Sequence, residues 1–220
     1  MNFRNQRIEN SILRIFFELL YNQFAWGYDF ISQLVSSGLW KSWILTTLPY
    51  LHGKRILEIG HGPGHLQIAI SKQNSDVYGL DSSKNMGRLA KRKLVKSGYS
   101  MKLVQAYTQF IPFPDASFDQ IVSTFPSDYM YHDFTLQELF RVLRWDGELI
   151  ILPVAWITEV KCYCRLTDWM FKATGQNPRA DDTWLIPFEK NGFSAEILII
   201  RLSTSEQAII IAKKLPINNK

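Results

Sequence analysis

The chain has 220 residues, of which 46% are hydrophobic and 20% are charged, and it carries a formal net charge of +5. A chain of this length and composition buries one sizeable core, which excludes an intrinsically disordered protein and favours one main domain with a small appendage. No run of 18 apolar residues occurs and charged residues interrupt the apolar N-terminal stretch, so we expect neither a membrane-spanning helix nor a signal peptide.

The first 50 residues are rich in large apolar side chains at roughly helical spacing. This pattern predicts two or three helices, which form an N-terminal helical cap over residues 1–50. We expect the cap to pack on a main domain that spans residues 51–220, so that the two parts form one compact unit. Peripheral contact with a membrane through the apolar faces of these helices is the alternative.

From residue 54 onward, short apolar runs alternate with amphipathic segments. Five runs predict strands, at residues 55–59, 76–80, 101–105, 118–123 and 148–152. Three segments predict helices, at residues 63–72, 83–96 and 135–143. The last helix opens with Thr135 and has Glu138 three residues later, which fits a capping box. Two further strands, at residues 193–202 and 207–213, predict an antiparallel hairpin at the sheet edge. We therefore expect an α/β fold with a Rossmann-like, doubly wound, seven-stranded sheet that is mostly parallel, plus the N-terminal helices.

Charge and cysteine usage indicate the setting in which the chain works. Residues 84–96 hold six Lys or Arg and no acid, which we interpret as a solvated helix face. A nucleic-acid or anionic-membrane patch is the alternative for this run, and a nucleic-acid partner is not expected. The spacing of Cys162 and Cys164 suits neither an ordinary structural disulfide nor a zinc site, so we expect free thiols in the cytoplasm.

The stretch "ILEIGHGPGH" at residues 56–65 places three glycines at alternate positions directly after the first strand. In an open α/β sheet, the ligand binds beyond the carboxyl ends of the strands. The nicotinamide pattern requires a glycine where His65 stands, and the Walker pattern requires a Gly-Lys-Ser/Thr that is absent. Asp81 ends the second strand 17 residues after Gly64, and a carboxylate there can accept two hydrogen bonds from a ribose diol.

Four motifs follow one another at proper intervals: "ILEIGHGPG", "VYGLDSSKNM", "IPFPDASFDQIVSTF" and "ELFRVLRWDGELIIL". Together they resemble the class I S-adenosylmethionine-dependent methyltransferases, in particular the small-molecule branch that includes the ubiquinone/menaquinone biosynthesis C-methyltransferases. The resemblance covers residues 52 to 152 and extends weakly to Phe193. It implies S-adenosylmethionine as the cofactor and a small acceptor. The aromatic content of the N-terminal helices and of residues 156–176 favours an apolar or aromatic one.

The resemblance also implies a set of cofactor contacts. Glu58 would reach the methionine ammonium group, and Asp81 would hold the ribose hydroxyls. The glycine turn would line the methionine part with Gly60, His61 and Gly62, and Gly64 would also belong to the cofactor site. Ser82 and Met86 would border the adenine, together with Tyr107 and Thr108 on the loop after the third strand, where the family commonly has an acid in place of Tyr107. Thr124, after the fourth strand, and Tyr28, on an N-terminal lid helix, would complete the contacts.

The acceptor is expected beyond the fourth strand, at "STFPSDYMYHDF", residues 123–134. His132 is the candidate general base there, and Tyr129 and Tyr131 are candidates for acid–base groups or for pocket lining. An acceptor-side insertion at about residues 156–182 would cover the mouth of the site. No metal is expected, because His61 and His65 lack an evident third ligand. Methyl transfer requires a well-positioned acceptor more than a catalytic triad.

Other functions remain open at this point. A non-catalytic S-adenosylmethionine-binding regulator or partner subunit is the main alternative, and Tyr107 at the acidic position gives it weight. A nicotinamide-dependent reductase and an RNA methyltransferase are less favoured. The signature Asn/Asp-Pro-Pro-Tyr/Phe of amino-group methylation is absent, since residues 124–127 read Thr-Phe-Pro-Ser. The acceptor, the atom that is methylated and the oligomeric state are not determined by the sequence.

Overall fold

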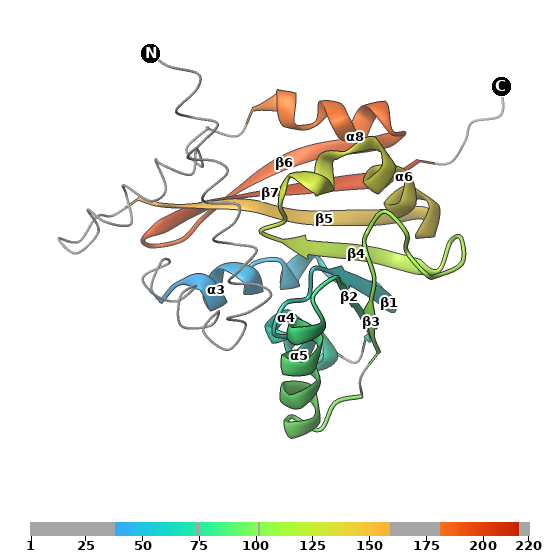
Figure 1. The fold of residues 1–220 in the computed structure, drawn as a ribbon. Coiled ribbons are helices and arrows are strands. Elements are labelled where there is room, and N and C mark those ends of the chain that lie inside the picture. Colours follow the sequence, from blue (N-terminus) through green and yellow to red (C-terminus); the bar gives the residue numbers. More distant parts are fainter. Residues whose placement is uncertain (1–37, 74, 101, 159–180, 216–220) are drawn as a thin grey trace, which may run out of the picture.

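A computed structural model of the chain describes residues 38–73, 75–100, 102–158 and 181–215. These residues form a seven-stranded sheet in the order β3-β2-β1-β4-β5-β7-β6. Helices cover both faces of this sheet, with α3, α4 and α5 on one side and α6 and α8 on the other (Figure 1). The arrangement confirms the predicted Rossmann-like, doubly wound α/β fold.

The parallel part of the sheet consists of β1 (Arg55–Ile59), β2 (Asp76–Asp81), β3 (Leu103–Gln105), β4 (Phe118–Thr124) and β5 (Leu143–Ile157). The predicted C-terminal hairpin is β6 (Phe193–Arg201) and β7 (Ser205–Lys214). The last strand, β7, pairs antiparallel with both β5 and β6. It therefore lies inside the sheet, and β6 forms the edge.

The helices are α3 (Trp40–Leu45), α4 (His65–Ser71), α5 (Lys84–Lys96), α6 (Asp133–Val142) and α8 (Ile186–Lys190). Three short 3-10 helices accompany them: η2 (Leu48–Tyr50), η3 (Asp128–Tyr131) and η4 (Asp182–Trp184). The start of α5 is set by Ser83, whose hydroxyl accepts a hydrogen bond from the Met86 N–H. This N-cap satisfies one of the amides that a helix start leaves without a partner.

The capping box predicted for α6 is wrong. The helix begins at Asp133, two residues before Thr135, and has no side-chain cap. Glu138 turns away from the helix start, because its carboxylate binds the guanidinium of Arg141 and accepts from the Ile111 N–H. A charge-assisted pair of this kind outcompetes a hydrogen bond to a neutral amide at the cap.

The predicted start of β5 at residue 148 is also wrong, because the strand begins at Leu143. Leu143 pairs with Phe118 and Glu148 pairs with Gln120, so residues 144–147 bulge out between two paired positions. The bulge is closed by Asp146 in a left-handed conformation, with φ of 60°. Asp-Gly sequences favour turns, so the hydrophobic pattern did not predict the pairing of Leu143 with Phe118 before the bulge.

Two apolar layers hold the sheet. One lies against α6 and α8 and includes Leu139 and Phe188; the other lies against α3 and α4 and includes Ile44 and Ile70. Fully burying each such side chain stabilises the fold by about 1.5–3 kcal/mol.

The N-terminal cap is described only from residue 38 onward, and α3 is the helix in that part. Trp43 is buried and its indole Nε1 donates to the hydroxyl of Ser205 at 2.9 Å, which fastens α3 to the start of β7. Residues 1–37, with Tyr28, and most of the predicted insertion at residues 156–182 lie outside the described residues. The division at residue 50 therefore stays a prediction. No helix within the described ranges is long and apolar enough to cross a membrane.

Candidate active site

The strand order places the glycine turn at the middle of the sheet. β1 lies between β2 and β4, so the chain runs outward from it in both directions along the sheet. The carboxyl ends of these three strands carry Glu58 and the turn, Asp81, and Thr124. A change of direction in strand order opens a crevice at that edge, which is where ligands bind in sheets of this type.

All three glycines of the turn adopt left-handed backbone conformations, with φ of 68° at Gly60, 50° at Gly62 and 83° at Gly64. A side chain at Gly64 would also collide with α5, because its Cβ would lie 3.0 Å from the Cβ of Ala90. Glycine is therefore needed for conformation at each position and for close helix packing at the third. The turn presents bare backbone to a ligand.

Asp81 braces this turn. One carboxylate oxygen accepts from the Gly62 N–H at 2.9 Å, and the other accepts from the Ser83 N–H at 2.8 Å. Each oxygen uses one of its two lone-pair positions in these bonds. Asp81 therefore fixes the glycine turn and the start of α5 while it still has accepting capacity for hydroxyl groups of a ligand.

Glu58 is the buried acid of the site, with 2% of its surface exposed. The side-chain amide of Gln67 on α4 donates to its carboxyl group at 2.8 Å and to the Tyr78 carbonyl at 3.1 Å. Burial raises the pKa of Glu58 to about 8; the hydrogen bond from Gln67 lowers it, and the charge of Asp81 adds to the rise. A cationic group beside Glu58 would stabilise the carboxylate and draw off its proton.

His61 contributes its ring as well as its backbone. The ring is buried, and Nδ1 lies 2.7 Å from the Gly62 carbonyl. Burial lowers the pKa of His61, so the ring is neutral and Nδ1–H donates to that carbonyl. Nε2 of His65 lies at hydrogen-bond distance, 3.1 Å, from Nζ of Lys93. The two histidines thus engage separate partners, and no three His, Cys, Asp or Glu side chains gather as a metal site within the described residues.

The residues predicted around an adenine differ in their exposure. Tyr107 shows 69% of its surface and Ser82 is also exposed, whereas Thr108 and Met86 are buried. The Tyr107 ring is therefore open to a ligand beside Asp81, to whose carbonyl the Ala106 N–H donates at 3.2 Å. The contacts of these residues with a cofactor stay predictions.

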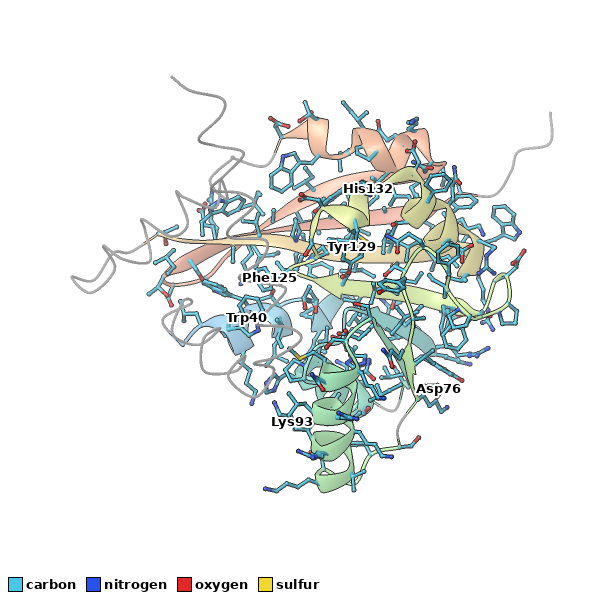
Figure 2. The ribbon with its side chains drawn as sticks, in the orientation of Figure 1. Trp40, Asp76, Lys93, Phe125, Tyr129 and His132 are labelled. Atoms are coloured by element: carbon cyan, nitrogen blue, oxygen red, sulfur yellow. The ribbon has the colours of Figure 1, made fainter. Side chains whose placement is uncertain are left out.

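Of the three catalytic candidates, Tyr129 lies against the glycine turn. A Cβ placed on Gly60 would lie 3.6 Å from the Tyr129 hydroxyl. Tyr131 packs edge-on against Phe188, with ring centroids 6.0 Å apart, and burial raises its pKa to about 12. His132 is exposed and provides the N-cap position of α6. Figure 2 shows Tyr129 and His132 toward α6, and Phe125 and Trp40 toward α3.

Phe125 follows β4 and adopts a left-handed conformation, with φ of 51°. Its N–H donates to the Leu152 carbonyl at 2.7 Å, and its ring stacks on Trp40 with centroids 4.3 Å apart. Such a conformation costs a bulky residue on the order of 1–3 kcal/mol and concentrates at functional sites. It turns the chain after Thr124, so that the aromatic ring lies on the α3 side of the sheet. Sequence patterns gave no sign of this turn.

Residues 57–151 match the family model described as a methyltransferase domain. The chain is 31% identical over 140 residues to the ubiquinone/menaquinone biosynthesis C-methyltransferase UbiE of Paraburkholderia phytofirmans, a match that covers 60% of this chain and 58% of that protein. It is 29% identical over 160 residues to UbiE of Blochmanniella floridana, covering 69% of this chain and 63% of that protein.

Over residues 57–151 the chain is similar to the class I S-adenosylmethionine-dependent methyltransferases. It spans about three fifths of the length of the curated relatives that it matches.

Solved structures share the methyltransferase fold. A putative S-adenosylmethionine-dependent methyltransferase from Methanococcus maripaludis superposes with a TM-score of 0.62 at 21% identity, covering 91% of this chain and 96% of that one. A methyltransferase from Aquifex aeolicus gives a TM-score of 0.60 at 19% identity, covering 80% of this chain and 89% of that one.

The glycine turn and its two acids fit the chemistry of S-adenosylmethionine. S-adenosylmethionine carries an ammonium group and a ribose diol; the site offers the buried carboxyl of Glu58 for the first and the accepting oxygens of Asp81 for the second. The bare backbone at Gly60 and Gly62 leaves room for close approach between them. The departure from the family pattern is Tyr107, which stands where an acid is common.

Proposed function

We propose that this chain transfers a methyl group from S-adenosylmethionine to a small, apolar or aromatic acceptor. The observation that carries the proposal is the turn after β1, in which Glu58 is buried and Asp81 bonds to the Gly62 amide. Relatives about 30% identical are named ubiquinone/menaquinone biosynthesis C-methyltransferases, which favours a quinone-related acceptor.

Each acid has a distinct role in this proposal. Glu58 pairs with the ammonium group of the cofactor, and Asp81 accepts from its ribose hydroxyls. The bound cofactor supplies the methyl group and a sulfonium leaving group. The protein then holds the acceptor so that its electron pair lies in line with the methyl carbon and the sulfur, and it excludes water from that line. When bound, the cofactor would leave as the neutral thioether with the electron pair of its carbon–sulfur bond, and the acceptor would release one proton to the solvent.

The acceptor side is lined by aromatic groups on both sides of β4. Phe125 lies toward α3, and Tyr129 lies toward α6 with its hydroxyl against the glycine turn. Rings of this kind favour a flat apolar acceptor over a charged one. We assign the positioning of the acceptor to Tyr129 rather than to His132, because the described structure brings the Tyr129 hydroxyl to the turn and leaves His132 exposed.

The test begins with binding. Calorimetry with S-adenosylhomocysteine and, separately, with NADH should give binding of the first alone; binding of NADH alone would contradict the proposal. A screen with isotopically labelled S-adenosylmethionine follows, using hydroxylated aromatic rings and quinone precursors as acceptors and bulk RNA as a comparison. Label should appear in the small aromatic compounds and stay out of RNA.

A second candidate function is a non-catalytic cofactor-binding subunit, which Tyr107 favours because it replaces the usual acid. Binding of S-adenosylhomocysteine without transfer to any compound of a broad screen would support this second function. Transfer to one acceptor, with the rate lowered in a Tyr129→Ala variant, would exclude it.

A further inference from the structure

Gln67 is a polar residue with 1% of its surface exposed, on the face of α4 that packs against the sheet. Both hydrogens of its side-chain nitrogen have acceptors, since Nε2 donates to Glu58 at 2.8 Å and to the Tyr78 carbonyl at 3.1 Å. Two bonds from one nitrogen fix the rotamer of the amide. The amide therefore points at the Glu58 carboxyl group.

The space for this amide comes from Gly79 on β2, which is directly opposite Glu58 in the sheet register. A Cβ at Gly79 would lie 3.2 Å from Nε2 of Gln67 and 2.9 Å from Cδ2 of His61. The missing side chain thus admits both groups to the carboxyl end of β1. Real Cβ atoms rarely approach neighbours this closely, so any larger residue at 79 would displace them.

We propose that Gln67 is a positioning residue of the cofactor site, whose amide holds the Glu58 carboxyl group in place and lowers the cost of the ionised form that pairs with the cofactor's ammonium group. The inference rests on the proposed function. An N–H donor stabilises the charged carboxylate over the neutral acid, which opposes the effect of burial. Without the Gln67 hydrogen bond, nothing from α4 would offset the cost of burying the ionised Glu58 carboxylate. Glu58 would then keep its proton to higher pH.

The titration of Glu58 also depends on the charged and polar groups of the neighbouring elements. Asp81, at the end of β2, adds a negative charge and raises the pKa of Glu58. His61, in the turn, is held neutral by burial. Helix α4 contributes Gln67, which carries no charge. Removal of the Gln67 amide therefore shifts the titration of Glu58 in one direction, upward.

The test compares Gln67→Met, which keeps length and removes both donors, with the unaltered chain. The carboxyl carbon of Glu58 is followed by NMR in the cofactor-free protein, and S-adenosylhomocysteine affinity is measured from about pH 6 to about pH 9. The Glu58 titration should move to higher pH. Affinity should fall about tenfold at neutral pH for each unit of that movement and recover toward the upper end of the range.

The control is Gln120→Met. Gln120 is equally buried and donates to the Glu148 carboxyl and the Tyr50 carbonyl, both at 2.9 Å, but it is remote from the turn along β4. Gln120→Met should lower thermal stability and leave the Glu58 titration unchanged. If Gln67→Met does not fold, Gln67→Glu keeps size and polarity, and its added charge should move the Glu58 titration upward as well.

An unchanged Glu58 titration, with affinity lowered equally at every pH, would overturn the positioning role and leave the proposed function standing. If the unaltered chain binds no S-adenosylhomocysteine at any pH, the proposed function fails. The inference fails with it, even where Gln67→Met shifts the Glu58 titration.

Discussion

Glu58 and Asp81 end neighbouring strands, yet their surroundings give them opposite tasks. Asp81 is partly exposed and each of its oxygens bonds to a backbone N–H, so its charge is well supported. Glu58 is buried with the Gln67 amide as its side-chain donor, so its charge is costly in the free protein. A binding site gains from this contrast, because a costly carboxylate interacts strongly with an arriving cation.

Replacement of Glu58 by Gln should weaken cofactor binding and stabilise the free protein at alkaline pH. Burial raises the pKa of Glu58 from its ordinary value of 4.5 to about 8, so the folded chain holds the proton more tightly than the unfolded chain. Stability therefore declines as pH rises between these two values and is lowest above the folded one. Urea denaturation at about pH 6 and about pH 9 should show a decline in the unaltered chain that Glu58→Gln lacks. A parallel decline in both proteins would refute the assignment.

Asp81→Ala should weaken S-adenosylhomocysteine binding by about 1–3 kcal/mol, because the ribose hydroxyls and the Gly62 amide lose their acceptor. Calorimetry measures the change. Asp76→Ala is the matched control, since Asp76 lies at the other end of β2 and pairs with Lys102. Equal affinities of Asp81→Ala and the unaltered chain would show that the ribose is held elsewhere.

At the scale of elements, hydrophobic runs bounded by turn residues located β1 without error and β2, β4 and α5 to within a residue. The same runs gave wrong starts for two elements whose bounds depend on tertiary contacts. At α6, Glu138 binds Arg141 instead of capping the helix, and at β5 a bulge separates the first paired residue from the rest of the strand. The same limit applies to the site. The glycine turn and its acids are local patterns, whereas the contacts of Gln67, on α4, and Tyr129, in η3, arise from tertiary packing.

Gly79 on β2 offers a test of how tightly these elements meet. In Gly79→Ala the new Cβ would lie 2.7 Å from Cδ2 of Leu103 and 2.9 Å from Cδ2 of His61, so these two side chains must move. We expect a loss of about 1–3 kcal/mol in stability and weaker S-adenosylhomocysteine binding.

Gly87→Ala is the control for that substitution. Gly87 lies within α5, and a Cβ there would meet nothing within 4 Å. The exchange should stabilise the fold by about 0.5–1 kcal/mol through helix propensity and leave binding unchanged. Equal destabilisation by both substitutions in thermal melts would contradict the close packing around Gly79.

At the scale of the whole molecule, the region after β4 joins segments that are distant in the sequence. Trp43 on α3 bonds to Ser205 at the start of β7, and Phe125, after β4, lies against both tryptophans of α3. Helix α3, the central strand β4 and the C-terminal hairpin are thus tied together. Loss of one of these contacts should lower the stability of the whole fold, because α3 and β7 share an apolar layer with β4.

A double-mutant cycle on Trp43 and Ser205 tests this coupling. Ser205 is fully buried, so Trp43→Phe leaves its hydroxyl without the indole donor and should lower the free energy of unfolding by about 1–3 kcal/mol. Ser205→Ala should do the same from the other side. Because both remove one bond, the double variant should lose less than the sum, with a coupling of about 0.5–3 kcal/mol. Strict additivity in urea denaturation would mean that the Trp43–Ser205 bond does not couple α3 to β7.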